Sequence, residues 1–149
     1  MSLLPKDALL LDNQLCFTLY AASRKVIQLY GPMLKELGLT YTQYITLLVL
    51  WEHPALSVKE LGQYLMLDTG TLTPLLKNME SKGLLTRTRF KQDERVVMIE
   101  ITPAGEALRA DTLRLLPDLL CSTQLESEDM VDMRDRLKDL LIRIKSCEV

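Results

Sequence analysis

Three cysteines carry the most reactive side chains of this sequence. Cys16, Cys121 and Cys147 are odd in number and widely spaced, so they match neither a secreted disulfide framework nor a zinc site built from paired cysteines. A cysteine thiolate can instead attack a peroxide and become a sulfenic acid, which a second thiol converts to a disulfide. The cysteines therefore indicate redox chemistry in a reducing compartment.

Cys16 lies in the stretch LDNQLCFTLYAASR, where apolar residues recur at helical spacing. We expect a helix from about residue 12 to 30 with Asp12 as its N-cap, which puts Cys16 in the first turn. The positive end of the helix dipole favours a thiolate there. Tyr20, four residues on, shares this face and could present a hydroxyl nearby. The alternative is that Cys16 has no reactive role, because a lone cysteine on an amphipathic helix is often a small buried hydrophobe.

His53 is the only histidine of the chain, and it stands just before Pro54. A histidine-based catalytic triad or a metal cluster is therefore implausible. We expect His53 to lie at a helix C-terminus, and we expect a protein with no metal, no cofactor and no enzymatic turnover.

Two capping boxes predict consecutive helices in the middle of the chain. Thr40 with Gln43 precedes the apolar run YITLLVLW, and Ser57 with Glu60 opens the short segment VKELGQYL. Gly31-Pro32 is expected to end the first helix, and the segment MLKELG is expected to be a turn.

A third helix and a hairpin follow. TGTLTPLLKNMESKG is expected to be helical from about Gly70 or Thr71, because Pro74 fits best in a first turn, and Gly83 should end it in the left-handed conformation. LLTRTRF and RVVMIEI read as two β-strands joined by the charged loop KQDE.

The ends of the chain carry further helices. Thr102-Pro103 should open a helix that Pro117 bends or interrupts, and Ser127 should open another with a long apolar stripe. Nothing else in the chain would cover these apolar faces, so a two-fold homodimer is expected. We assign residues of about 40–102 to a winged helix-turn-helix unit, and residues of about 8–38 and 103–149 to the dimerisation region of the same single subunit.

Two short helices followed by a basic hairpin are typical of a winged helix-turn-helix. The predicted fold is therefore mainly α with a small β-hairpin, flanked by N- and C-terminal dimerisation helices. The net charge of the chain is −2, yet Lys77 to Arg95 holds six basic and three acidic residues. The alternative is an ordinary helical domain with a polar surface.

The predicted partner is double-stranded DNA, read by the last helix of the motif in the major groove and by the hairpin at the backbone or minor groove. A dimer would place two reading helices one DNA turn apart, on a pseudo-palindromic operator. The candidate DNA-binding residues are Asp68, Thr69, Thr71, Thr73, Lys77, Arg87, Arg89, Lys91, Asp93 and Arg95.

Three separate motifs resemble one known family, and they follow one another along the chain in the order typical of that family. KQDERVVMIEITPAG resembles the wing signature of MarR-family transcriptional regulators, and DTGTLTPLLKNMESKG resembles their recognition helix. The TLTPLLK core and LCFTLYAASR are closer to the organic-hydroperoxide-sensing branch, usually called OhrR. The similarity runs from about Leu11 to Leu141.

The resemblance implies roles for particular residues. Cys16 would sense organic hydroperoxide, and Tyr30 and Tyr41 would donate hydrogen bonds to its sulfur across the dimer interface. Cys121 would be the resolving thiol on the other subunit, as in the two-cysteine members of the branch. Cys147 and a small cellular thiol remain alternatives for resolving oxidised Cys16.

The resemblance therefore implies a repressor that leaves its operator when Cys16 is oxidised and so derepresses a peroxide-resistance gene. Two competitors stay open: a regulator released by a small phenolic or lipophilic ligand with Cys16 a spectator, and a thiol peroxidase. Activation instead of repression also stays open. No apolar run approaches a membrane span and the N-terminus lacks signal-peptide features, so we expect a cytoplasmic protein with no membrane partner.

Overall fold

A computed structural model of the chain describes residues 6–124 and 126–146. Two short 3-10 turns, Asp7–Leu9 and Leu11–Asn13, lead into helices and strands in this order: α1 (Leu15–Leu29), α2 (Gly31–Leu37), α3 (Tyr41–Glu52), β1 (Ala55–Ser57), α4 (Val58–Leu65), α5 (Thr69–Ser81), β2 (Leu85–Phe90), β3 (Asp93–Ile101), α6 (Pro103–Ser122) and α7 (Ser127–Ser146). This mainly α fold with one small sheet confirms the predicted fold class.

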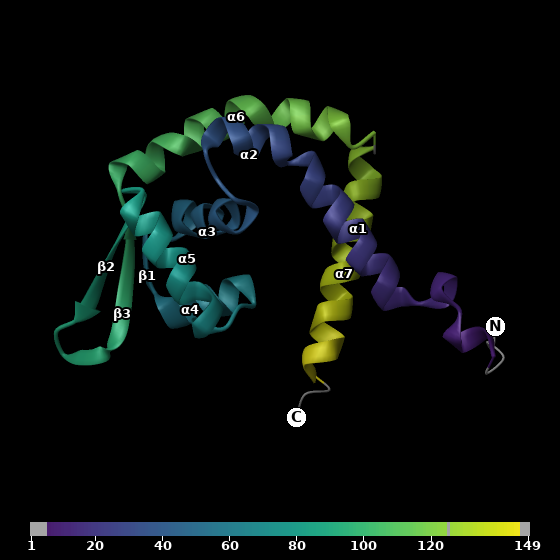
Figure 1. Cartoon of the computed structure of the whole chain (residues 1–149), viewed down its shortest axis with the longest axis horizontal. Helices are drawn as coiled ribbons and strands as arrows, with labels where there is room; N and C mark the ends of the chain where they lie inside the picture. The colour runs from purple at the N-terminus through teal and green to yellow at the C-terminus, as the bar shows by residue number, and fades with distance from the viewer. Residues whose placement is uncertain (1–5, 125, 147–149) are drawn as a thin grey trace.

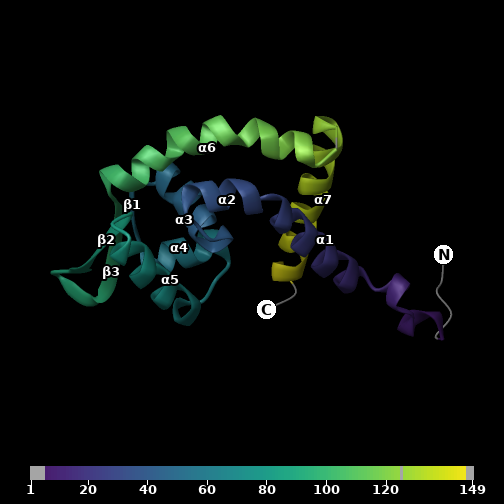
Figure 2. The same ribbon diagram turned by 45° about the horizontal axis from the view of Figure 1, so that its top comes forward.

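The elements form two groups joined by the long helix α6 and the short helix α2. The winged unit, α3 to β3, lies on one side of the molecule, and α1 and α7 lie on the other (Figure 1). Helix α6 extends from the wing to α7, and α2 runs beneath it, as the turned view also shows (Figure 2). The N-terminal turns project away from the body.

Both predicted capping boxes are present. The Thr40 hydroxyl accepts a hydrogen bond from the Gln43 amide at 3.3 Å, and the Gln43 side chain accepts one from the Thr40 amide at 3.1 Å. Ser57 and Glu60 form the same reciprocal pair at the start of α4. These bonds satisfy amides that a helix start leaves without partners, which fixes where α3 and α4 begin.

The predicted start of the first helix is wrong by three residues. Asp12 lies in a 3-10 turn and does not cap α1, which begins after Gln14. The Gln14 side chain donates to the carbonyls of Ala8 and Leu10, and the Asn13 side chain donates to that of Asp7. These side-chain bonds to the backbone stabilise turns where the apolar spacing alone predicts helix.

The predicted turn MLKELG is also wrong, because it forms most of helix α2. Pro32 occupies its first turn, where a missing amide proton costs nothing. Gly38 then ends the helix in the left-handed conformation, with φ of 67°. The proline therefore starts a new helix at the point where it was expected only to end the previous one.

Helix α5 begins slightly earlier than predicted and keeps Pro74 in its interior. Asp68 holds the first turn, because its carboxylate accepts both from the Thr71 amide at 2.8 Å and from the Thr71 hydroxyl at 2.9 Å. Gly83 follows the helix with a positive φ of 73°, as predicted.

The sheet has three antiparallel strands in the order β1-β3-β2. The hairpin is confirmed, although β3 begins at Asp93 and leaves only Lys91 and Gln92 between the strands. Strand β1 was not predicted. It is three residues long and pairs Leu56 with Ile99, far along the chain.

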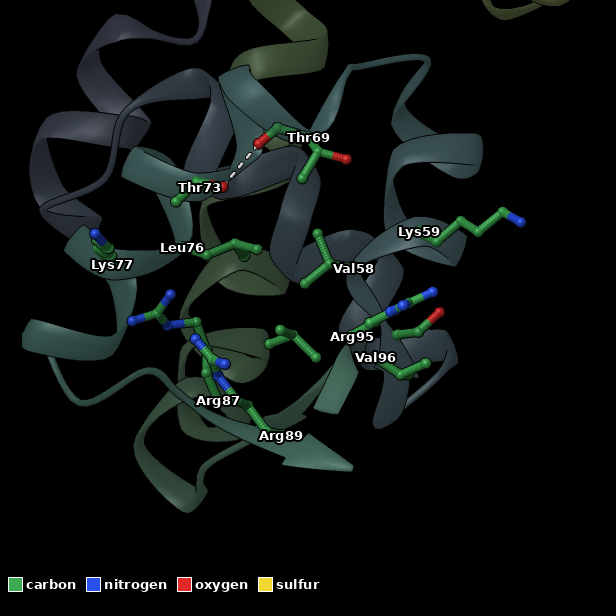
Figure 3. Close-up of a pocket in the computed structure, with 12 residues that line it drawn as sticks. Val58, Lys59, Thr69, Thr73, Leu76, Lys77, Arg87, Arg89, Arg95 and Val96 are labelled. Atoms are coloured by element: carbon green, nitrogen blue, oxygen red, sulfur yellow. Dashed lines mark hydrogen bonds between the residues drawn. The ribbon is translucent and has the colours of Figure 1, made fainter. Parts of the chain in front are cut away.

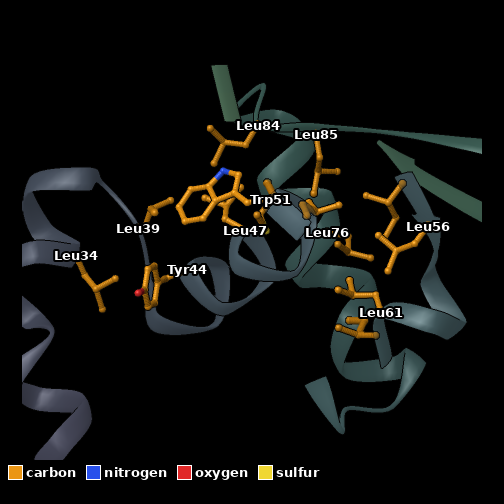
Figure 4. Close-up of a cluster of buried hydrophobic side chains, with 14 of the residues drawn as sticks. Leu34, Leu39, Tyr44, Leu47, Trp51, Leu56, Leu61, Leu76, Leu84 and Leu85 are labelled. Carbon is orange, nitrogen blue, oxygen red and sulfur yellow. The ribbon is translucent and has the colours of Figure 1, made fainter. Parts of the chain in front are cut away.

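The core of the winged unit is closed and apolar. Leu47, Leu61, Leu72, Met79 and Ile99 have no exposed surface, and the cluster extends from α3 across α5 to the sheet (Figure 4). The Trp51 indole donates to the Gly105 carbonyl at 3.1 Å, which ties this core to α6.

The terminal helices are long and continuous. Helix α6 passes through Pro117 without interruption and is curved in Figure 1. Of the two outcomes predicted for Pro117, a bend or an interruption, the interruption does not occur. The predicted helix from Ser127 is confirmed as α7. Within the described residues, none of the helices is both long and apolar enough to span a membrane.

Candidate redox and DNA-binding site

The recognition helix α5 exposes a face of hydroxyls and one ammonium. The Thr73 hydroxyl donates to the Thr69 carbonyl at 2.8 Å, and the Thr71 hydroxyl donates to Asp68. With these protons used inside the helix, the methyl groups and oxygen lone pairs of both threonines stay available for base edges. The bonds from Thr71 lower the pKa of Asp68, which keeps this N-cap charged. Lys77 is exposed one turn further on.

Strand β2 is held against α5 by one ion pair. The Arg87 guanidinium contacts Glu80 through Nη2 at 2.8 Å and Nε at 2.9 Å, and the Arg87 amide donates to the same carboxylate at 3.1 Å. These hydrogen bonds from Arg87 lower the pKa of Glu80. Arg87 therefore fixes the wing to the recognition helix as well as adding positive charge.

The tip of the wing is ordered by Asp93. Its carboxylate accepts a hydrogen bond from the Arg95 amide at 3.0 Å, which ties Asp93 to the backbone two residues further along the wing. This leaves the Arg95 side chain exposed, as are those of Arg89 and Lys91.

A cavity of about 470 Å³ lies between α4, α5 and the wing. Its described lining holds five basic side chains and no acidic one, from Lys59, Lys77, Arg87, Arg89 and Arg95. Figure 3 shows Arg87 and Arg89 close together on one side of it and Thr69 and Thr73 on the other. The structure thus brings two of the three predicted threonines, Lys77 and all three predicted arginines around one cationic hollow. The other predicted residues, Asp68, Thr71, Lys91 and Asp93, are not among the lining residues.

Lys59 was missed in the sequence. It follows the Ser57 cap in the first turn of α4, where nothing local distinguishes it from a solvated surface lysine. Only the fold brings it to the rim of the same hollow as Arg95.

The predicted sensing thiol is accessible. Cys16 is free and exposed in the first turn of α1, so its position relative to the helix dipole is as predicted. The Tyr20 hydroxyl accepts from the Arg24 guanidinium at 3.5 Å, and that guanidinium lies 5.3 Å from the Tyr20 ring centroid. Cys121 is also free and exposed, near the end of α6. Cys147 lies outside the described residues.

Three tyrosines meet where α1 ends and α3 begins. The ring centroids of Tyr30 and Tyr41 are 5.4 Å apart in an edge-to-face arrangement, and Tyr44 lies 5.7 Å from Tyr30. Burial, with a smaller contribution from the neighbouring Tyr30, raises the pKa of both Tyr41 and Tyr44. Their hydroxyls therefore stay protonated and can donate hydrogen bonds. Tyr44 was not predicted, although its spacing of three from Tyr41 places it on the same helix face.

An apolar cavity of about 640 Å³ adjoins this tyrosine cluster. Tyr30 and Tyr41 line it together with side chains of α1, α6 and α7, among them Val26, Leu120 and Met133. The structure therefore brings two predicted sensing tyrosines to one apolar hollow between the terminal helices. Among residues 6–124 and 126–146, acidic, cysteine and histidine side chains form no group of three that could hold a metal ion.

The chain is similar to known transcriptional regulators. Residues 28–111 match the family profile described as transcriptional regulator SarA/Rot. The organic hydroperoxide resistance transcriptional regulator of Bacillus subtilis is 45% identical over 91% of this chain and 92% of its own.

Solved structures of AbfR show the same fold. AbfR of Staphylococcus epidermidis is 33% identical, with a TM-score of 0.75 over 91% of this chain and 94% of its own. Reduced AbfR bound to DNA gives 0.74 at 32% identity, over 95% of this chain and 99% of its own. Disulfide-formed AbfR gives only 0.59 at 32% identity, over 92% and 91%.

The winged unit with its cationic hollow, the terminal helices and these similarities lead to one assignment. The chain belongs to the MarR family of winged helix-turn-helix transcriptional regulators, in the branch of the organic hydroperoxide resistance regulators.

Proposed function

We propose that this chain forms a homodimer that represses transcription from a pseudo-palindromic operator while Cys16 is reduced. An organic hydroperoxide oxidises Cys16, the dimer leaves the DNA, and a peroxide-resistance gene is derepressed. The protein reacts once per oxidation event, so it is a sensor and not a turnover enzyme.

The cationic hollow supports the DNA-binding half of this proposal. Five basic side chains beside α5 would neutralise phosphates, while the exposed threonine methyl groups suit thymine contacts in the major groove. Reduced AbfR, whose fold matches over nearly the whole chain, is bound to DNA in its solved structure, which supports DNA binding by this chain.

The exposed thiol supports the redox half. The Cys16 thiolate attacks the distal peroxide oxygen, the O–O bond breaks, and an alkoxide leaves and takes a proton to become an alcohol. Sulfur is oxidised to a sulfenic acid, and the peroxide is reduced. The hydroxyls of Tyr30 and Tyr41 of the partner subunit would donate hydrogen bonds at this sulfur.

The second step needs another thiol. Cys121 of the other subunit attacks the sulfenic sulfur, the new S–S bond forms, and water leaves. A disulfide spans Cα atoms no more than about 7 Å apart, so closing one between separated segments has to move α1 or the end of α6. The lower TM-score of disulfide-formed AbfR supports a rearrangement of this kind.

One observation carries the proposal: α1 holds an exposed thiol in its first turn and ends at Tyr30, which contacts α3 of the winged unit. The test is Cys16→Ser. Organic hydroperoxide should release the wild-type dimer from operator DNA and should leave the variant bound. Full peroxide sensitivity in Cys16→Ser would end the proposal.

Matched variants identify the resolving thiol. Non-reducing mass analysis after peroxide should give a cross-linked dimer for wild type and for Cys147→Ser, but a monomer mass for Cys121→Ser. A cross-link retained in Cys121→Ser and lost in Cys147→Ser would assign the role to Cys147. A mixed disulfide in wild type would assign it to a small thiol.

A second candidate keeps the fold and changes the trigger. The apolar cavity beside Tyr30 and Tyr41 favours a small phenolic or lipophilic ligand. This alternative predicts that such a ligand releases Cys16→Ser and wild type from DNA equally well, with no peroxide present.

A further inference from the structure

Gln43 has a side chain that joins the start of α3 to the end of α5. It is only 4% exposed. Its Oε1 accepts from the Thr40 amide at 3.1 Å and from the Lys82 ammonium at 3.0 Å, and its Nε2 donates to Asn78 Oδ1 at 2.7 Å. The capping box at the start of α3 is therefore also a bridge to the recognition helix.

Chemistry fixes the orientation of this amide. An ammonium and a backbone N–H can only donate, so the oxygen of Gln43 has to face Lys82 and Thr40. The nitrogen then faces Asn78, which presents its carbonyl oxygen. Lys82 also donates to the Gly38 carbonyl at 2.9 Å, so the end of α2 joins the same network.

The same first turn of α3 carries Tyr41, a predicted sensing tyrosine, and Tyr44. Gln43 stands between Tyr41 and Tyr44, whose rings contact Tyr30 at the end of α1. A displacement of α1 therefore meets the first turn of α3 directly. Asn78, at the far end of the bridge, adjoins Lys77 on the DNA-facing side of α5.

Apolar side chains of α3 and α5 also pack together, in the leucine-rich core around Leu47, Leu72 and Leu76. The hydrophobic effect that holds them is not directional, so this core selects no particular polar partner. The Gln43–Asn78 hydrogen bond has a set geometry and is shielded by the burial of Gln43.

We propose that Gln43, bonded to Asn78 and Lys82, is a positioning residue that makes the recognition helix follow the tyrosine cluster. This inference rests on the proposed redox control of operator binding and names the link within it. Breaking the bridge should uncouple oxidation from the position of α5.

The test compares operator Kd for reduced and peroxide-treated dimers. In Asn78→Ala, an exposed position that should fold, the ratio of oxidised to reduced Kd should fall about fivefold or more below that of wild type. Asn78→Asp keeps an acceptor for Gln43, so its ratio should stay near the wild-type value even if its charge weakens both affinities. Equal ratios in wild type and Asn78→Ala would overturn the inference.

Gln43→Leu extends the test, with Thr46→Val as its matched control. Thr46 is buried in the same helix, but its hydroxyl donates only to the Thr42 carbonyl within α3. Both variants should lose stability, whereas only Gln43→Leu should have a lower ratio of oxidised to reduced Kd than wild type. A lower ratio in both variants would mean a general weakening of α3 and would count against the bridge.

A second readout needs no oxidation. Because coupling is reciprocal, operator binding by the reduced dimer should slow hydrogen exchange of the amides of residues 27–34 in wild type and not in Asn78→Ala. If wild type is never released by peroxide, the proposed function fails while this arm still tests the bridge. The same exchange change in wild type and Asn78→Ala would overturn the bridge alone.

Discussion

The winged unit and the terminal helices bury their apolar residues very differently. Helices α3, α4 and α5 enclose leucines with no exposed surface, whereas α1 and α7 contain no buried residue among those the structure describes. Yet α1 and α7 are rich in apolar side chains, and Val26, Met133 and Leu141 are each more than 40% exposed. The winged unit has its own core, and the terminal helices α1 and α7 do not.

This difference indicates why a sensor would be built on α1. A helix that completes its packing only against a second subunit can shift without unfolding the winged unit. The tyrosine cluster and Gln43 stand at the boundary between the two regions.

The largest effect should follow from a cavity in the core of the winged unit. Leu47→Ala removes a fully buried side chain and should lower the free energy of unfolding by about 2–5 kcal/mol. Urea unfolding followed by circular dichroism measures it. The loss should be the same at low and high protein concentration, and a loss that vanished at high concentration would contradict a self-sufficient core.

The terminal helices should respond through assembly. Leu137 and Leu141 lie on one face of α7 and line the apolar cavity. In the proposed dimer, an aspartate at Leu141 would bury a charge, so Leu141→Asp should weaken dimerisation about a hundredfold, or roughly 2.7 kcal/mol. Sedimentation should show monomers that keep helical content. Lys138→Asp, at the rim of the same cavity, is the control, and dimers of Leu141→Asp as tight as wild type would place the interface elsewhere.

Two arginines of the winged unit should contribute differently to operator binding, and this effect should be smaller than the one on dimerisation. Arg95 is exposed, whereas Arg87 is bound to Glu80. Arg95→Gln should weaken operator binding about tenfold and reduce the slope of log affinity against log salt by about one, as loss of a phosphate contact requires. Arg87→Gln should weaken binding with a smaller change in slope. Equal slope changes would mean that both side chains reach phosphate.

The sequence allowed prediction of features that depend on neighbours in the chain. Both capping boxes, the left-handed Gly83 and the first-turn position of Cys16 follow from spacings of a few residues. Features that depend on tertiary contacts were missed. Strand β1 exists because Leu56 pairs with Ile99, and the role of Lys59 exists because α4 faces the wing.

The residues of the candidate site also separate into those that the local sequence indicated and those that only tertiary contacts bring together. Residue types and family motifs pointed to Cys16, Tyr30, Tyr41 and the basic wing. They gave no sign that Glu80 would hold Arg87, or that the cap Gln43 would reach Asn78, since each bond crosses between elements.

The smallest predicted effect is a pH dependence confined to the winged unit. The pKa of Glu80 lies below its ordinary value of 4.5 because Arg87 donates to its charged form. A depressed folded-state pKa stabilises the fold fully above the unfolded value, and that stabilisation is lost as pH falls through the folded value. Acidification from pH 6 to below pH 4 should therefore lower the thermal midpoint of wild type slightly more than that of Glu80→Gln. Because both side chains are partly exposed, the difference should shrink at high salt.

Glu106→Gln, which removes a longer surface ion pair at 3.6 Å on α6, is the matched control and should track wild type across the same range. A Glu80→Gln profile identical to wild type would mean that the wing is held to α5 by the backbone sheet and core alone.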